Sequence, residues 1–237
     1  MANPEEKLKI IGLVGGMSWE STLEYYRIIN ERTKERLGGF HSAKILLYSV
    51  DFQEVESLQH RGGWKELTDL MIDAAQRVER AGAEILVICT NTMHKMAPEV
   101  QASIRIPLLH IVDVTAAEIK RRSLHKIGLL GTRFTMEQDF YRQRLSQDHG
   151  LEVLIPEERE RELIHGILYN ELCLGEIKDA SKGVFQGIIA GLVSRGAQGI
   201  ILGCTEIPLL VSQKDYDIPL FDTTTIHARA AADKALE

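Results

Sequence analysis

Two polar segments at equivalent places in the chain carry side chains that could move a proton. The first reads Cys-Thr-Asn-Thr at residues 89–92, and the second reads Gly-Cys-Thr-Glu at residues 203–206. A cysteine thiol has an ordinary pKa of about 8.5 and becomes a base where local dipoles lower that value. Hydroxyl, amide and backbone N–H donors can stabilise the negative charge that develops on a carboxylate beside a carbanion. The residue types therefore favour removal of a proton next to a carboxylate.

An internal repeat relates the two segments. The sequences at residues 11–15, 82–84 and 106–109 return at residues 127–131, 196–198 and 218–221, with offsets of 116, 114 and 112 residues. At the 114-residue offset, Thr90 corresponds to Cys204. A pseudo-twofold axis between the two halves would place these side chains on opposite sides of one cleft. That arrangement suits chemistry in which a proton leaves one face of a carbon and another returns to the opposite face.

Strand-like apolar runs alternate with helix-length stretches in both halves. In the first half the expected strands are Ile10–Val14, Lys44–Tyr48, Glu84–Ile88 and Ile106–Ile111, and the expected helices are Glu20–Leu37, Trp64–Arg80 and Ala97–Ile104. Near-continuous apolar strands that alternate with helices are typical of parallel sheets covered on both faces. We therefore expect an α/β fold of two pseudo-symmetric lobes, each a roughly four-stranded parallel sheet flanked by helices. In such sheets ligands bind beyond the carboxyl ends of the strands, which puts the active site in the cleft between the lobes.

The repeat also suggests the domain boundaries. The first α/β lobe is expected at residues 1–115 and the second at residues 116–221. A C-terminal helix within residues 222–237 is expected to pack back on the first lobe.

The motifs resemble those of the aspartate/glutamate racemase family over nearly the whole chain. The family carries Cys-Asn-Thr-x-His in its first lobe and Gly-Cys-Thr-Glu in its second. The second motif is intact at residues 203–206, whereas the first reads Thr-Asn-Thr-Met-His at residues 90–94. Thr90 thus stands where the family usually has a catalytic cysteine. Together with the sequences at residues 15–17 and 131–137, this Thr/Cys pair is similar to a bacterial subgroup described as racemising L-aspartate and L-glutamate.

The resemblance implies a homodimeric racemase of acidic amino acids that uses neither pyridoxal phosphate nor a metal ion, so that no cofactor is expected. Cys204 would remove the α-proton of the L-enantiomer. Thr90, directly or through water, would return a proton to the other face. Because a threonine hydroxyl is a far weaker acid than a thiol, we expect turnover from L to D to be faster than the reverse.

Further residues are expected to hold the substrate. Asn91, Thr92 and Thr205 offer suitable donors, and the resemblance adds Met17, through its backbone, and Gln59. Thr132 follows Gly131, at the position in the second half that corresponds to the one after the Gly15 turn in the first. Glu171 is a candidate to bind the substrate ammonium group. Structural alternatives remain open. Gln59 could be a solvated loop residue, Glu171 could be a charge on a helix surface, and the glycines before Met17 could, with Ser18, only serve a strand-to-helix turn. Thr135 is expected to cap a helix as part of a capping box at residues 135–138.

The remaining cysteines are expected to be structural. Cys89 ends an apolar strand, and Cys173 lies near a helix end that Gly175 closes. Cys204 differs from them, because it precedes a turn or helix start whose free amides favour a thiolate.

Three histidines lie near strand ends without metal-binding spacing. His94, His110 and His227 are expected to form structural hydrogen bonds, with a second interpretation of His94 as a residue that orients groups near Thr90.

Composition limits the classes of function. The 237-residue chain has a net charge of −6, which argues against a nucleic-acid partner. An odd number of cysteines without C-x-x-C spacing argues against a disulfide framework or a zinc site and suggests the cytoplasm. We see no signal peptide at the polar start and no apolar run long enough for a membrane span.

Two alternatives remain open. One is another member of the same superfamily, namely a broad-specificity or hydantoin racemase, a maleate isomerase or a decarboxylase. The other is a two-lobed protein that binds an amino acid without reacting with it.

Overall fold

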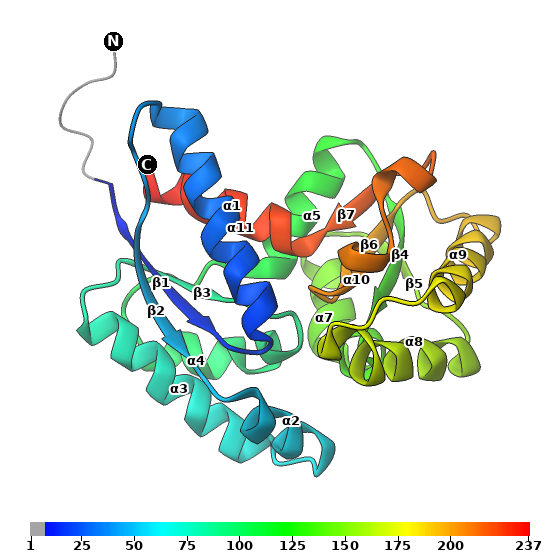
Figure 1. The fold of residues 1–237 in the computed structure, drawn as a ribbon, viewed down its shortest axis with the longest axis horizontal. Helices are drawn as coiled ribbons and strands as arrows, with labels where there is room; N and C mark the ends of the chain where they lie inside the picture. The colour runs from blue at the N-terminus through cyan, green and yellow to red at the C-terminus, as the bar shows by residue number, and fades with distance from the viewer. Residues whose placement is uncertain (1–7) are drawn as a thin grey trace. The chain divides into compact units, whose positions relative to one another are not determined.

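The computed structural model describes residues 8–237, so most of the polar start discussed above lies outside the described residues. The chain divides into two compact units, Met1–His110 with His227–Glu237 and Ile111–Ile226 (Figure 1). Within residues 8–237, no helix has the length and apolar character needed to cross a bilayer.

A three-stranded parallel sheet forms the centre of the first unit. Its strands are β1 (Ile10–Gly15), β2 (Lys44–Ser49) and β3 (Ile85–Ile88), in the order β2-β1-β3. The strand β1 pairs with β2 along its whole length and with β3 from Ile11 to Val14. Parallel register brings the carboxyl ends of all three strands to one edge of the sheet.

Helices cover both faces of this sheet, and the strands alternate their side chains between two cores. Ile85 and Val87 of β3 pack with α1 (Trp19–Leu37) and α11 (Thr223–Ala235). Leu86 and Ile88 pack on the other face, which α2 (Phe52–His60), α3 (Trp64–Arg80) and α4 (Ala97–Ser103) cover. Figure 1 shows α1 and α3 on opposite sides of the strands. This alternation follows from the two-residue period of a strand.

Ion pairs fix α11 against α1 within the first unit. The guanidinium of Arg32 donates two hydrogen bonds to Asp233, with its Nε and Nη2 at 2.9 and 3.1 Å from the carboxylate oxygens. Arg36 binds the same carboxylate, and Arg229 of α11 binds Glu35 of α1. The end of the chain therefore belongs to the unit with which the chain begins.

The prediction of a fourth strand at Ile106–Ile111 was wrong. Only an isolated bridge joins Leu108 to Leu86, through two backbone hydrogen bonds. Pro107 has no N–H to donate, and the chain enters the helix α5 (Ile111–Arg121) directly afterwards. The first sheet therefore has three strands.

The second unit contains a four-stranded parallel sheet in the order β5-β4-β6-β7. Its strands are β4 (Lys126–Gly131), β5 (Glu152–Leu154), β6 (Ile200–Gly203) and β7 (Leu220–Asp222). The helices of this unit beyond α5 are α6 (Arg133–Glu137), α7 (Asp139–Gln143), α8 (Glu158–Asn170), α9 (Asp179–Ser194) and α10 (Ile207–Leu210). A single hydrophobic core joins its helices and strands. The predicted class, α/β with parallel sheets flanked by helices, is confirmed.

Candidate active site

The turn after β1 begins the candidate site in the first unit. Gly16 has φ +90°, and a Cβ atom on it would collide with the backbone of Val50. Ser18 caps α1, because its Oγ accepts the N–H of Ser21 at 3.3 Å. The prediction of Ser18 as an N-cap is therefore confirmed, and Met17 is buried between the glycine turn and the cap.

Thr90 lies between the end of β3 and the short 3-10 helix η1 (Thr92–Met96). It is partly exposed, whereas Asn91 and Thr92 are buried. The backbone turns sharply here, since the N–H of His94 binds the carbonyl of Asn91 at 3.1 Å. This turn collects hydroxyl, amide and backbone donors at the carboxyl end of β3.

Gln59 contacts the same turn from α2. Its side chain is buried, and its Nε2 lies 3.3 Å from the sulfur of Met93. The alternative of a solvated loop glutamine is wrong, because Gln59 is the penultimate residue of α2 and the exposed turn begins after His60.

Three buried histidine rings lie close together next to the turn at residues 90–94, which we call the Thr90 turn. The ring of His94 lies 4.6 Å from that of His110 and 5.7 Å from that of His227, between centroids. His227 binds the hydroxyl of Tyr25 through Nδ1 at 2.9 Å and the carbonyl of Leu109 through Nε2 at 2.8 Å. Burial lowers the pKa of His227 to about 4, so the ring is neutral at pH 7.

Cys204 lies in the second unit, directly after β6. Its Sγ donates a hydrogen bond to Glu206 Oε2 at 2.9 Å, and Thr205 Oγ1 donates to the same oxygen at 2.8 Å. Glu206 is 5% exposed, whereas Cys204 and Thr205 are partly exposed. A thiol therefore lies next to a buried carboxylate at the carboxyl end of a strand.

The expectation that free amides favour a Cys204 thiolate is wrong. Burial raises the pKa of this thiol well above its ordinary value, and the charges of Glu206 and Cys173 raise it further. A hydrogen bond from the backbone of Glu206 opposes the rise but does not reverse it. Four-residue α10 offers too few aligned amides to outweigh a carboxylate at hydrogen-bond distance.

Thr132 follows β4 as predicted, but it rather than Thr135 caps the next helix. The Oγ1 of Thr132 accepts the N–H of Thr135 at 3.3 Å. The predicted capping box at residues 135–138 is wrong, because Thr135 is already inside α6.

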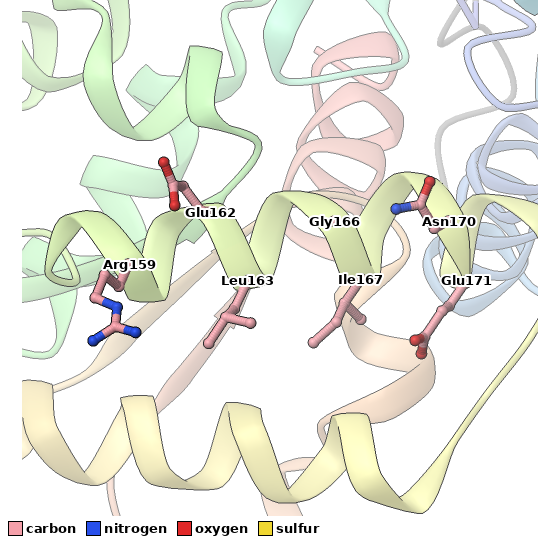
Figure 2. A pocket seen from close by; sticks show the side chains of 7 residues that line it. All are labelled: Arg159, Glu162, Leu163, Gly166, Ile167, Asn170 and Glu171. Atoms are coloured by element: carbon pink, nitrogen blue, oxygen red, sulfur yellow. The ribbon is translucent and has the colours of Figure 1, made fainter.

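Glu171 is the C-cap directly after α8 and lines a pocket of about 490 Å³. Figure 2 shows the pocket-lining side chains of Leu163, Ile167 and Glu171 on one side of this helix. The carboxylate of Glu171 accepts the hydroxyl of Ser181 at 2.5 Å. Lys178 lies 3.6 Å from it. The carboxylate thus joins the start of α9 to the end of α8.

The structure also places the other two cysteines. Cys89 is fully buried, as predicted for a core residue, and burial raises the pKa of its thiol. Cys173 lies in the 3-10 helix η3 (Leu172–Leu174), which Gly175 ends at φ +77°. Its electrostatic interaction with Cys204 was not expected from the sequence.

Among the described residues, no group of three or more histidine, cysteine or acidic side chains has the arrangement of a metal site.

Each unit brings together only part of the predicted set. In the first unit the sheet edge and α2 gather Thr90, Asn91, Thr92 and Gln59, and Met17 follows the neighbouring strand. In the second unit Cys204 and Thr205 lie together, Thr132 follows the adjacent strand, and Glu171 ends a helix.

Sequence reasoning missed two features of the site. Glu206 was given no role beyond its place in the Gly-Cys-Thr-Glu motif, although its spacing of two residues from Cys204 was a usable signal. The histidine cluster had no such signal, because His94 and His227 are distant in sequence and meet only through packing.

Comparison with known proteins identifies relatives of the whole chain. The family model described as Asp/Glu/Hydantoin racemase matches residues 14–231. The broad specificity amino-acid racemase RacX of Bacillus subtilis is 24% identical over 237 aligned residues, which cover 96% of this chain and 98% of that protein.

Solved structures agree with this match. The crystal structure of a candidate Asp/Glu racemase from Yersinia pestis has 56% identity and a TM-score of 0.91, covering 97% of this chain and 100% of that one. An aspartate racemase homologue from Pyrococcus horikoshii has 37% identity and a TM-score of 0.83 with the same coverage.

Proposed function

Because the chain belongs to the Asp/Glu/Hydantoin racemase family, we propose that it racemises aspartate, glutamate or both without pyridoxal phosphate, with the L-enantiomer as the better substrate. The observation that carries this proposal is the pair formed by Cys204 and Glu206 at the end of β6. It gives the chain a proton-transfer group at the position where the family motif has its second-lobe cysteine.

The first step of the proposed mechanism prepares the thiol. Cys204 passes its proton to Glu206, the carboxylate to which it is hydrogen-bonded, and becomes a thiolate. The thiolate then takes the α-proton of the L-amino acid, which leaves a carbanion beside the substrate carboxylate. A buried carboxylate that accepts one proton is a suitable partner, since proton transfer proceeds best between groups in hydrogen-bond contact.

The second step returns a proton to the opposite face. Thr90, or a water molecule that it holds, donates this proton, and the D-amino acid is released. The alkoxide or hydroxide that results takes up, through solvent, the proton held on Glu206. Cys204 keeps the former α-proton until this proton exchanges with solvent. Thr90 starts the reverse reaction poorly, because its hydroxyl loses a proton far less readily than a thiol.

Donors around the two strand ends hold the substrate in this proposal. The backbone and side chains of Asn91 and Thr92, with Thr205, stabilise the charge that develops on the α-carboxylate. Met17, Gln59, Thr132 and Glu171 complete the proposed binding set, with Glu171 on the substrate ammonium group.

One observation favours a second candidate, a racemase of broader specificity. The similarity to RacX extends over 96% of this chain, and that protein is described as a broad specificity enzyme. A substrate panel separates the two candidates.

The test is chiral chromatography after incubation of the purified protein, without added cofactor, with each enantiomer of aspartate, glutamate and alanine. We expect opposite enantiomers from the acidic substrates only, with faster initial rates from the L-forms. Equal conversion of alanine would favour broad specificity. Equal initial rates from both enantiomers at saturating concentration would contradict the asymmetry, and no conversion of any substrate would contradict racemisation.

We propose further that the protein acts in the cytoplasm as a homodimer. Cys89, Cys173 and Cys204 form no disulfide in the described part of the chain, which suits a reducing compartment.

A further inference from the structure

The buried histidine cluster of the first unit touches the Thr90 turn at a point that the proposed mechanism does not use. His94 Nδ1 lies 2.8 Å from the carbonyl oxygen of Thr90. A carbonyl oxygen only accepts, so Nδ1 carries the proton and donates it. The imidazole of His94 therefore fixes the direction of this carbonyl.

Holding that carbonyl also fixes the amide of the next residue. The peptide bond between Thr90 and Asn91 is trans, since Met17-Ser18 is the one cis bond in residues 8–237. In a planar trans peptide the C=O and the following N–H point in opposite directions. The hydrogen bond from His94 thus keeps the N–H of Asn91, which lies in the same peptide plane, pointing away from the histidine.

Packing from two helices holds His94 in turn. Its ring stands edge-on to His110, whose neighbour Leu109 accepts a hydrogen bond from His227 Nε2. Because Nε2 of the neutral His227 ring carries its proton, Nδ1 accepts the hydroxyl proton of Tyr25. Tyr25 lies on α1 and His227 on α11, so both helices position the segment that packs against His94.

We propose that His94 is a positioning residue for the racemase reaction, which aims the Asn91 amide at the substrate α-carboxylate and so stabilises the carbanion. This inference rests on the proposed function and deepens it. The amide stabilises the same carbanion in both directions, so its loss slows L-to-D and D-to-L exchange alike. A change at Thr90, in contrast, alters the two directions unequally.

The test compares His94→Asn with His94→Gln. An asparagine amide nitrogen falls near the position of Nδ1 and can still donate to the Thr90 carbonyl, whereas a glutamine amide nitrogen falls near Nε2. We expect His94→Asn to keep α-proton exchange within a few-fold of wild type and His94→Gln to lose roughly 10- to 100-fold in kcat, in both directions. His60→Asn, at an exposed histidine, serves as the control, and urea unfolding of each variant reports stability.

The expected result is that the two variants have similar unfolding free energies while only His94→Asn keeps its exchange rate. A merely structural histidine would not give this difference. Equal losses in the two variants, a wild-type rate in His94→Gln, or failure of both to fold would overturn the positioning role. If wild-type protein exchanges none of the amino acids, the proposed function itself is wrong, and the two failures are thereby distinguished.

Discussion

The Cys204 thiol and the Glu206 carboxylate share a hydrogen bond, and this pairing determines how the thiol can act as a base. Burial and, after it, the charge of Glu206 raise the pKa of the thiol, so the pair rests with its proton on sulfur. The same carboxylate is the acceptor that can take this proton when substrate arrives. Glu206 therefore has two opposite effects, which one substitution separates.

Glu206→Gln should lower the pKa of Cys204 and yet slow exchange. Without the negative charge the thiolate forms at lower pH, but the proton loses its acceptor, and we expect exchange to fall roughly 100-fold. The pH dependence of alkylation by iodoacetamide measures the thiol, in a Cys173→Ser background with buried Cys89 left in place. Unchanged alkylation together with full exchange would contradict both roles.

Thr90→Cys should make the enzyme more symmetric. A thiol in place of the hydroxyl supplies a proton store for the second face, so D-to-L exchange is expected to rise about tenfold or more, while L-to-D exchange changes less. Initial rates from each enantiomer at saturating concentration, with Thr90→Ser as the control that keeps a hydroxyl, provide the measurement. A D-to-L rate no higher in Thr90→Cys than in Thr90→Ser would argue against the assignment of Thr90.

Buried His227 should make folding stability depend on pH. Its pKa is about 4 in the folded chain against an ordinary 6.5. Below pH 6.5 the unfolded chain binds a proton that the folded chain does not. Stability is therefore complete above pH 6.5, falls by up to about 3 kcal/mol as the pH drops to about 4, and changes no further below that through this group.

Urea unfolding at pH 7, 6 and 5 of wild type and His227→Gln checks this prediction. The substitution removes the titration, so the difference in unfolding free energy between the two proteins should shrink as the pH falls. A constant difference would show that His227 does not titrate in this range.

At the scale of elements, short turns with special backbone geometry place the site residues after the strands. Gly16→Ala should destabilise the protein by more than about 1 kcal/mol, because alanine disfavours φ +90° and its Cβ would meet the Val50 backbone. Gly187→Ala in α9 is the matched control, since no atom lies within 4 Å of the added Cβ. It should stabilise by about 0.5–1 kcal/mol. Equal stability of the two variants in urea would refute the argument.

Most elements follow from apolar periodicity, and the exceptions have local physical causes. Strands β1 and β2 and helix α3 lie at their predicted positions, within a residue at each end. The segment at Ile106–Ile111 has strand composition but makes one bridge, because Pro107 and the start of α5 interrupt it. Composition measures how well residues suit a strand, whereas pairing depends on neighbours that sequence does not show.

The features of the site likewise divide into those that the sequence predicts and those that depend on the tertiary fold. Cys204, Thr205 and Asn91 could be located because a repeat and a motif mark the ends of strands. The raised pKa of Cys204 could not, since it depends on burial and on the direction of the Glu206 side chain. The histidine cluster depends on α11 returning to the first unit, which is a property of the tertiary fold.

At the scale of the whole molecule, the C-terminal helix makes the first unit discontinuous in sequence. Ala228, Ala231 and Ala232 of α11 lie in the core that β1 and α1 share. The proposal that residues 1–115 and 116–221 form two separate lobes stays a prediction. A fragment ending at residue 115 would lack this part of its core.

The proposed homodimer is tested by mass. The chain has a mass of 26.6 kDa. Light scattering coupled to size exclusion should therefore give roughly 53 kDa for a twofold assembly. A value near that of a single chain at micromolar concentration would contradict the homodimer without affecting the proposed chemistry.

Proton NMR in D2O tests the central claim most directly. Purified protein without added cofactor is incubated with L-aspartate or L-glutamate, and the α-proton signal is followed for wild type and Cys204→Ser. The account predicts loss of this signal with wild type and appearance of the D-enantiomer, and no change with Cys204→Ser. An α-proton that persists with wild type, or exchange that survives in Cys204→Ser, would contradict it.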